Sequence, residues 1–199
     1  DASESLGSYY INDTFKNKFT GTIGKIGCIS FNGNKIITSG GGGIILLDDE
    51  KLYGRAKYLT TQAKNDPIYF VHDEIGYNFR LTNVQAAIGL AQLEQLPRFL
   101  KVKKDINKGY KALIKNNENF RIANTPSYSQ NNHWLNILQI RNVSEKMNVE
   151  KLMHSLEEKG IQTRPVWKLN HLQAPFKSCQ SYKIKKAINL INSSLCLPS

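Results

Sequence analysis

The chain has 199 residues, of which 40% are hydrophobic and 22% are charged, as is ordinary for a soluble globular protein with one large domain or two small ones. No apolar run approaches the roughly 20 residues of a membrane-spanning helix, and no signal-peptide pattern opens the chain. The net charge of +11 comes from lysines spread over expected helix faces, without the aromatic and basic modules of nucleic-acid-binding proteins, so we expect neither membrane nor nucleic acid as a partner.

The first part of the chain is expected to alternate strands and turns. Asp1–Gly7 is expected to open a helix. Ile26–Phe31 is a short apolar run with β-branched residues and predicts a buried strand. Asn32–Lys35 has the composition of a turn, and a second apolar strand, Ile44–Leu47, follows the glycine run Gly40–Gly43.

Capping signals then predict helices. Asp48 or Asp49 is placed to cap a helix that runs to about Leu59. Thr82 and Gln85 form a capping box ahead of an apolar segment, which predicts a largely buried helix. Pro97 favours the first turn of another helix, which runs to about Lys115.

The pattern changes after a polar joint at Asn116–Asn119. Trp134–Ile140 alternates as a half-buried strand does, and Asn148 caps a helix that Gly160 ends. A strand over Ile161–Trp167 and a last helix from Ser181 or Tyr182 are expected to follow. The fold class is therefore mixed α/β, with residues 1–115 as the end of a larger domain and residues 116–199 as a smaller α+β domain.

The three cysteines are Cys28, Cys179 and Cys196, an odd number without C-x-x-C spacing, so neither a disulfide framework nor a zinc site is expected. Cys28 is expected to be a buried thiol and the compartment cytoplasmic. The histidines show no metal-ligand spacing either. Both chain ends indicate cuts in a longer protein, because the chain starts at Asp1 rather than Met and stops without a helical cap.

Lys35 is at an unusual position for a lysine, because it follows a predicted buried strand and precedes Ile36, Ile37 and the glycine run. A lysine held against apolar walls has a lowered pKa and becomes a nucleophilic amine, which is what Schiff-base chemistry needs. The spacing alone equally allows a lysine that reaches from a strand end into water. The glycine run lacks the order G-x-x-x-x-G-K-[ST] of a phosphate-binding P-loop.

Four segments together resemble the DegT/DnrJ/EryC1/StrS family of sugar aminotransferases. They occur in the family's order and are Asp1–Ser8, Ser30–Gly43, Glu74–Gly89 and, more weakly, Gly160–Pro165 with His171 and Cys196–Ser199. The resemblance implies the fold type I of pyridoxal-phosphate-dependent transferases, similar to aspartate aminotransferase. The chain would supply the end of the large α/β domain and a small C-terminal α+β domain.

The resemblance also implies roles for individual residues. Lys35 would form the Schiff base with pyridoxal 5′-phosphate and move a proton at the substrate carbon. Asp1 would keep the pyridine nitrogen protonated, Glu4 would lie near the ring hydroxyl, and Ser30, five residues before the lysine, would bind the phosphate. Asn78 would reach the phosphate from the other subunit, which implies a homodimer with a shared active site.

Three further residues are candidate substrate contacts: Arg80, Arg164 and His171. A surface or packing role is an equally open interpretation of Arg164 and His171. For Asp1, Glu4, Ser30 and Asn78, the residues alone are compatible with a terminal acid, a helix-start charge, a strand hydroxyl and a turn amide.

The implied reaction is transamination of a nucleotide-linked keto-deoxysugar, a UDP- or GDP-4-keto-6-deoxyhexose, with glutamate as amino donor, in bacterial surface-glycan biosynthesis. The Asn78 segment and the stretch Leu59–Pro67 most resemble members that make 4-amino-4,6-dideoxy sugars on the perosamine, bacillosamine and legionaminic acid routes. We expect the fragment to be inactive alone. A catalytically inactive remnant or regulatory module of the same fold, and a basic nucleic-acid-binding protein, are the alternatives.

Overall fold

The computed structural model describes residues 1–12, 14–66 and 68–199, so Pro67, the last residue of one compared stretch, lies outside the described residues. The chain divides into two compact units. The first contains Asp1–Lys101 and Pro126–Asn132, and the second contains Val102–Thr125 and His133–Ser199. The domain boundary predicted between residues 115 and 116 falls inside the second unit, and that assignment of domains stays a prediction.

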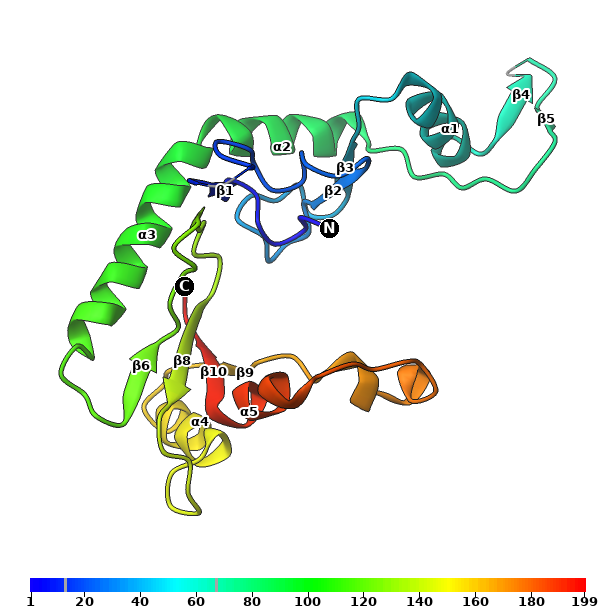
Figure 1. Ribbon diagram of the computed structural model, residues 1–199. Helices are drawn as coiled ribbons and strands as arrows, with labels where there is room; N and C mark the ends of the chain where they lie inside the picture. The colour runs from blue at the N-terminus through cyan, green and yellow to red at the C-terminus, as the bar shows by residue number, and fades with distance from the viewer. Residues whose placement is uncertain (13, 67) are drawn as a thin grey trace. The chain divides into compact units, whose positions relative to one another are not determined.

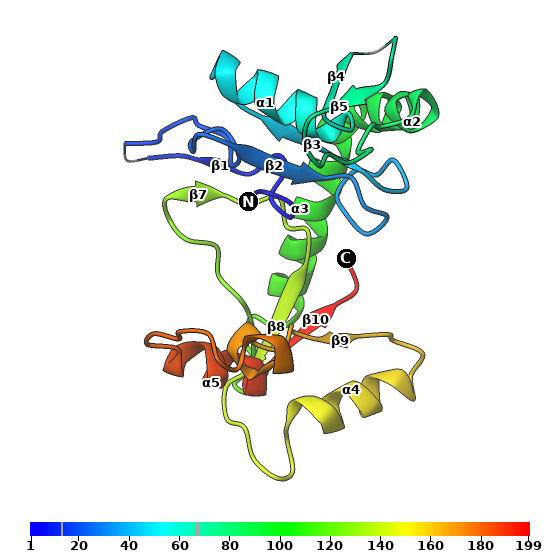
Figure 2. The same cartoon turned by 90° about the vertical axis from the view of Figure 1, so that its right-hand side faces the viewer.

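A two-stranded antiparallel hairpin lies at the centre of the first unit. It consists of β2 (Gly27–Ser30) and β3 (Gly43–Leu46), with Gly27 opposite Leu46 and Ser30 opposite Gly43 (Figure 2). These are the two apolar strands that the sequence predicts. Strand alternation buries Gly27 and Ile29 and turns Cys28 to the other face, where it is exposed. The prediction of a buried Cys28 thiol is therefore wrong.

The chain before the hairpin forms turns rather than the expected helix. The amide of Ser5 donates to the carbonyl of Ala2 (3.1 Å), and that of Ser8 donates to the carbonyl of Ser5 (2.8 Å). Gly7 then has φ of +83°, a left-handed conformation that ends any helical path. A short antiparallel pair follows, between β1 (Tyr9–Tyr10) and β7 (Ser129–Gln130).

The predicted capping residues start the helices of the first unit. The side chain of Asp49 accepts the amides of Lys51 and Leu52 at the start of α1 (Glu50–Thr60). Thr82 and Gln85 form the complete capping box of α2 (Asn83–Glu94).

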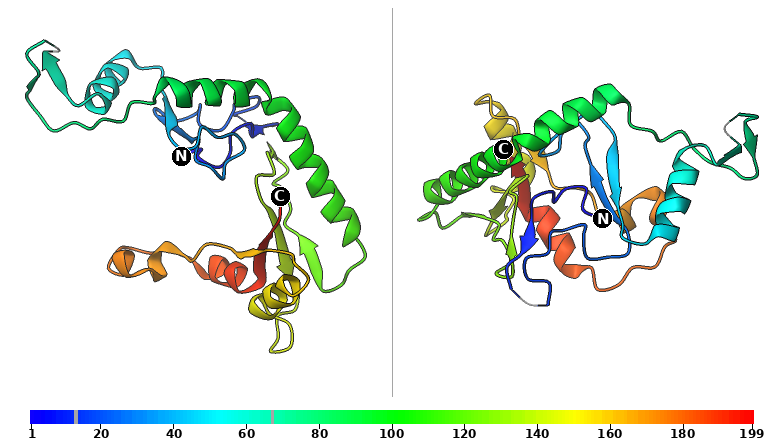
Figure 3. Two further views of the ribbon diagram at one scale, coloured as in Figure 1. Left: turned by 180° about the vertical axis from the view of Figure 1, so that it is seen from behind. Right: turned by 90° about the horizontal axis from the view of Figure 1, so that it is seen from above.

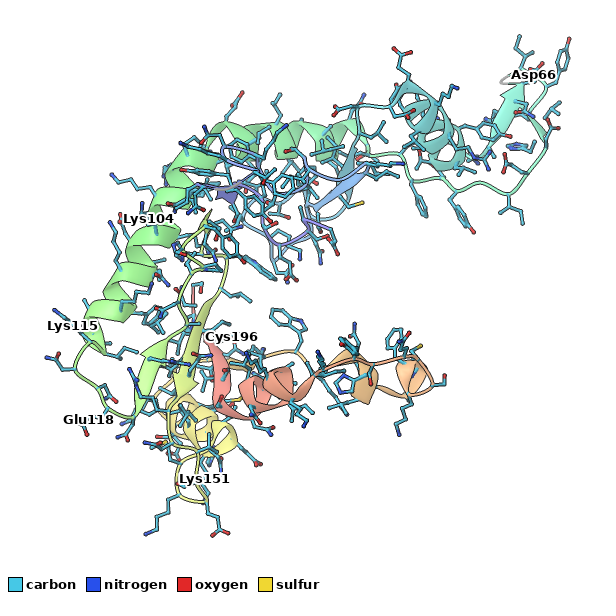
Figure 4. The ribbon with its side chains drawn as sticks, in the orientation of Figure 1. Asp66, Lys104, Lys115, Glu118, Lys151 and Cys196 are labelled. Atoms are coloured by element: carbon cyan, nitrogen blue, oxygen red, sulfur yellow. The ribbon has the colours of Figure 1, made fainter. Side chains whose placement is uncertain are left out.

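The chain between α1 and α2 forms a small antiparallel pair that the sequence did not predict, β4 (Lys64–Asp66) with β5 (Val71–His72). The long helix α3 (Leu96–Leu113) follows α2 directly (Figure 1). Lys104 on α3 and Lys115 just after it are exposed and extend into solvent, as expected of solvated lysines (Figure 4).

The sequence predicts a largely buried helix α2, and this prediction is wrong. No residue of α2 is buried, and Val84 (71%) and Leu90 (58%) are largely exposed. The apolar residues surround the helix, whereas the loop near Ser39 contacts it on the side of Gly89. An apolar residue on every side of a helix leads to burial only where other parts of the protein pack against every side.

The second unit is built on a four-stranded antiparallel sheet in the order β6-β8-β10-β9 (Figure 1). Figure 3 shows β8 beside the red strand β10 from behind. Its strands are β6 (Phe120–Ile122), β8 (Asn136–Ile140), β9 (Arg164–Pro165) and β10 (Ser194–Leu197). The predicted strand over Trp134–Ile140 is confirmed by β8. The strand expected over Ile161–Trp167 is reduced to two residues, because it pairs only with the short β10.

Two helices complete this unit. Asn148 caps α4 (Val149–Glu157) by accepting the amide of Lys151, and Gly160 follows with φ of +73°, as predicted. Helix α5 (Lys185–Ser193) starts later than the predicted Ser181 or Tyr182, after two 3₁₀ turns at Asn170–Leu172 and Ala174–Phe176. Within the part of the chain that the structure describes, no helix combines the length and apolarity that a bilayer crossing requires.

The core of the second unit packs on one face of the sheet. Ile122, Leu138 and Leu195 from three adjacent strands form a buried cluster, with Tyr110 and Leu152 among the side chains packed against it. At its edge, the buried side chains of Asn107 and Asn136 share a 2.8 Å hydrogen bond. The fold of this unit therefore depends on both apolar packing and a satisfied buried amide pair.

Candidate active site

Lys35 lies on a loop that closes on the end of β2. Its amide donates to the carbonyl of Asn32 (3.1 Å). The hydroxyl of Thr38 (3.0 Å) and the amide of Ser39 (3.1 Å) both donate to the carbonyl of Phe31, which joins the two ends of the loop. Ile37 is buried at 1% exposure and anchors the same loop. The loop therefore holds Lys35 in a fixed place beyond the strand.

The glycine run returns the chain from this loop to β3. Gly42 has φ of +81°, and a Cβ there would lie 2.5 Å from Leu81. A Cβ on Gly43 would lie 2.5 Å from the carbonyl oxygen of Ile29 on the paired strand. Only glycine allows this path, so the run is a tight connection beside Lys35.

The segment that starts at Asp1 is fastened to β2. The amide of Ala2 donates to the carbonyl of Cys28 (2.8 Å), and the Ala2 side chain is buried at 2% exposure. A Cβ on Gly27 would lie 1.8 Å from the carbonyl oxygen of Gly21, so the chain also passes in close contact there. These contacts bring Asp1 to the same strand that leads to Lys35.

The carboxylate of Asp1 is oriented by Ser3, a residue that the sequence analysis missed. Oδ1 of Asp1 accepts the Ser3 amide at 3.0 Å and also the Ser3 hydroxyl. This arrangement is a turn in which one carboxylate oxygen is held and the other is left to act on a neighbour. The signal that could have identified Ser3 is a hydroxyl residue two positions after an aspartate, the spacing of this kind of turn.

Glu4 and Lys35 meet although they are far apart in sequence. Nζ of Lys35 lies 3.5 Å from Oε1 of Glu4. The side chain of Lys35 is 13% exposed, whereas that of Glu4 is 55% exposed. The structure thus brings together two of the residues that the sequence singled out.

Ser30 is the last residue of β2 and is partly buried. Its Oγ accepts the amide of Asn32 at 3.3 Å, so the hydroxyl is placed at the start of the lysine loop. An oxygen fixed in this way keeps its own proton for donation to an acceptor.

Asn78 and Arg80 lie on an exposed segment between β5 and α2. Asn78 forms an isolated bridge with Thr61, and the amides of Tyr77 and Phe79 donate to the carbonyls of Leu59 (2.8 Å) and Thr60 (2.9 Å). The segment is thus held against the end of α1, and a Cβ on Gly42 would lie 2.5 Å from Leu81, the residue that follows Arg80.

An ion pair that the sequence did not indicate ties this segment to α1. The guanidinium of Arg55 contacts both carboxylate oxygens of Glu74. These hydrogen bonds lower the pKa of Glu74 and raise that of Arg55. The pair fixes the first residue of the segment that leads to Asn78.

Arg164 and His171 belong to the second unit. Arg164 is exposed on β9 opposite Cys196 and lines a small cavity of ≈ 230 Å³ with Thr163. His171 lines a separate cavity of ≈ 510 Å³ with Trp167 and Tyr182 among its walls. The ring of Trp167 stacks on that of Trp134 at 5.9 Å, an aromatic pair that the sequence analysis did not single out.

The mixed helix-and-sheet fold is that of the fold type I transferases. The chain belongs to the DegT/DnrJ/EryC1/StrS aminotransferase family, which matches residues 1–199. The family depends on pyridoxal phosphate.

Named relatives agree with this membership. The chain is 35% identical to EpsN of Bacillus subtilis, over 100% of this chain and 50% of the relative. It is 38% identical to GDP-perosamine synthase of Escherichia coli O157:H7, over 84% of this chain and 43% of the relative. The solved structure of PseC from Helicobacter pylori, an aminotransferase of pseudoaminic acid biosynthesis, superposes with a TM-score of 0.87 at 25% identity, covering 100% of this chain and 53% of that one. The chain thus spans about half the length of the relatives it matches.

The residues of the first unit fit pyridoxal 5′-phosphate in their chemistry. An amine (Lys35), a carboxylate (Asp1) and a hydroxyl (Ser30) are all fastened to β2 or to the loop that follows it. These are the groups that a carbonyl, a pyridine nitrogen and a phosphate would each require.

Proposed function

We propose that the full-length protein that carries this chain is a pyridoxal-phosphate-dependent transaminase of nucleotide-linked keto-deoxysugars. Two observations support the proposal: the family membership, and the attachment of Asp1 and Ser30 to β2 with Lys35 on the loop that follows this strand. The relatives named GDP-perosamine synthase and UDP-4-amino-4,6-dideoxy-N-acetyl-β-L-altrosamine transaminase favour a GDP- or UDP-linked 4-keto-6-deoxyhexose as substrate and bacterial surface glycans as the destination.

Each residue then has a defined task. Lys35 holds the cofactor through its amine and afterwards carries a proton to and from the substrate carbon. Asp1, oriented by Ser3, keeps a proton on the pyridine nitrogen. When bound, pyridoxal phosphate supplies a cationic ring, which takes up the negative charge left when the substrate carbon loses its proton.

The remaining groups position the reactants. Ser30 would donate a hydrogen bond from its hydroxyl to the phosphate, and Glu4, which lies beside the amine of Lys35, would be near the ring hydroxyl. We propose a homodimer in which Asn78 of one protomer reaches the phosphate site of its partner. Arg80, Arg164 and His171 are proposed substrate contacts, and glutamate is the proposed amino donor.

The three cysteines form no disulfide, which suits a reducing compartment, and we propose a cytoplasmic enzyme. Residues 1–115 would serve as part of the cofactor-binding domain and residues 116–199 as the small domain. The fragment by itself would be inactive, since it covers about half of each relative.

The experiment compares the full-length protein with its Lys35→Ala and Lys35→Arg variants. We expect a visible absorbance band with pyridoxal phosphate in the wild type, covalent capture on Lys35 by borohydride, and bleaching of the band by glutamate. Both variants should lose capture, whereas only Lys35→Arg keeps the charge beside Glu4.

A folded wild-type protein without capture would contradict the transaminase and favour an inactive member of the fold. Capture without turnover of GDP- or UDP-4-keto-6-deoxyhexose would retain the cofactor role and reject the substrate class.

A further inference from the structure

The second unit contains a groove between α5 and the strands β6 and β8, with a volume of ≈ 740 Å³. We call it the basic groove and define it by Arg121, Arg141 and Lys186, together with the amides Gln139, Asn189 and Asn192. The proposed function uses none of these residues.

The charge of the basic groove is uncompensated. Its lining has three cations and, among the described residues, no Asp or Glu. None of the three cations forms an ion pair within the described ranges of the chain. Helix α5, which forms one wall, has no acidic residue in its sequence either. A concave site of one charge sign attracts counter-ions of the other sign.

The two arginines are oriented by the protein through one nitrogen each. Arg121 lies directly opposite Gln139 on the neighbouring strand, and its Nε donates to Oε1 of Gln139 at 2.8 Å. Nε of Arg141 donates to the carbonyl of Phe120 at 3.4 Å. The terminal nitrogens of both guanidiniums donate to no partner among the described residues, so each pair of N–H groups is left as a forked donor.

The opposite wall adds a third cation and polar groups on one helix face. Lys186 and Asn189 are three residues apart on α5, which places them on the same side of the helix. Leu190 gives this wall an apolar part. The groove therefore offers two forks, a point charge, amides and a small apolar surface.

We propose that the basic groove binds a small molecule that carries phosphate groups. Phosphate oxygens match guanidinium forks in geometry, and a diphosphate has enough charge to balance three cations, which a single carboxylate does not. The amides and Leu190 suit the remainder of such a ligand, as in a nucleoside diphosphate. The inference is independent of the proposed function, because binding here involves no residue of the lysine loop.

The test is calorimetric titration of the full-length protein, saturated with pyridoxal phosphate, with inorganic phosphate, pyrophosphate, UDP and, as the reference anion, inorganic sulfate at low ionic strength. Arg121→Gln and Arg141→Gln should each weaken pyrophosphate binding about tenfold, the loss expected for one charge-assisted hydrogen bond. Lys186→Gln should weaken it as well. The matched control is Lys185→Gln, which removes the same charge from the neighbouring position outside the groove and should change the affinity by less than about twofold.

UDP that binds more tightly than pyrophosphate, with the same sensitivity to Arg121→Gln, assigns the site to nucleotides. Equal affinities assign it to the phosphate groups alone. The proposal fails if the wild type binds pyrophosphate no better than inorganic sulfate. It also fails if the folded Arg121→Gln and Arg141→Gln variants keep the wild-type affinity, since binding would then occur elsewhere.

Discussion

The amine of Lys35 lies 3.5 Å from the carboxylate of Glu4, and the two residues come from segments that are joined through β2. The lysine is the more enclosed member, with 13% of its side chain exposed against 55% for the glutamate. Water on the glutamate side screens the pair, so its contribution to stability is small. The role of the ion pair is instead to direct the amine of Lys35, which extends from the lysine loop toward Glu4.

Glu4→Gln should therefore separate function from stability. The free energy of unfolding should change by less than about 1 kcal/mol, because the pair is partly exposed. Turnover by the full-length protein should fall about tenfold, because the ion pair that directs the amine is lost. Glu118→Gln, at an exposed position of the second unit (Figure 4), is the control for loss of a carboxylate. Equal turnover in both variants would contradict the directing role of Glu4.

The glycine run gives a second prediction. In Gly43→Ala the new Cβ would lie 2.5 Å from the backbone oxygen of Ile29, which cannot yield without opening the hairpin. We expect a loss of roughly 2 kcal/mol or more in unfolding free energy and weaker cofactor retention. Gly33→Ala is the matched control, since its Cβ would meet nothing within 4 Å. Denaturant titration measures the unfolding free energy of both variants. A loss in Gly43→Ala alone indicates a steric clash at Gly43, whereas equal losses indicate a general effect of adding a side chain to the loop.

Local signals in the sequence predicted local structure well. Asp49, the Thr82 and Gln85 box, and Asn148 each act through hydrogen bonds within one helical turn, and all three are confirmed as caps. Such bonds depend on a few consecutive residues, so the sequence alone contains the information.

Features that depend on partners distant in sequence were missed or wrong. β10 was not predicted, because Ser194–Leu197 becomes a central strand only through pairing with β8 and β9. The burial of Cys28 was wrong, because an apolar run does not reveal which strand face is covered. Among the site residues, the contact of Glu4 with Lys35 follows from the path of the first segment along β2, which no spacing in the sequence specifies.

Buried hydroxyls offer a third prediction. Ser194 is 2% exposed, and its Oγ has no hydrogen-bond partner among the described residues. Ser39 is 3% exposed, but its Oγ donates to the carbonyl of Gly41 at 2.6 Å. Ser194→Ala should leave the unfolding free energy unchanged or raise it by up to about 1 kcal/mol, whereas Ser39→Ala should lower it by about 1 kcal/mol. Urea unfolding of both variants measures the difference, and a destabilised Ser194→Ala would show that its hydroxyl is satisfied in solution.

His133 gives the last prediction, on pH. Burial, with repulsion from Lys111 and Lys104, lowers its pKa from the ordinary value of 6.5. The unfolded chain therefore takes up a proton at higher pH than the folded chain does, so stability present above pH 6.5 is lost as the pH falls through that value and below it.

His133→Asn removes the titrating group and tolerates the backbone φ of +51° at this position. We expect the variant to lose less stability than the wild type on acidification from neutral pH, whatever its stability at neutral pH. Urea unfolding of both proteins over this pH range gives the two slopes, and equal slopes would exclude His133 as the residue that links protonation to unfolding.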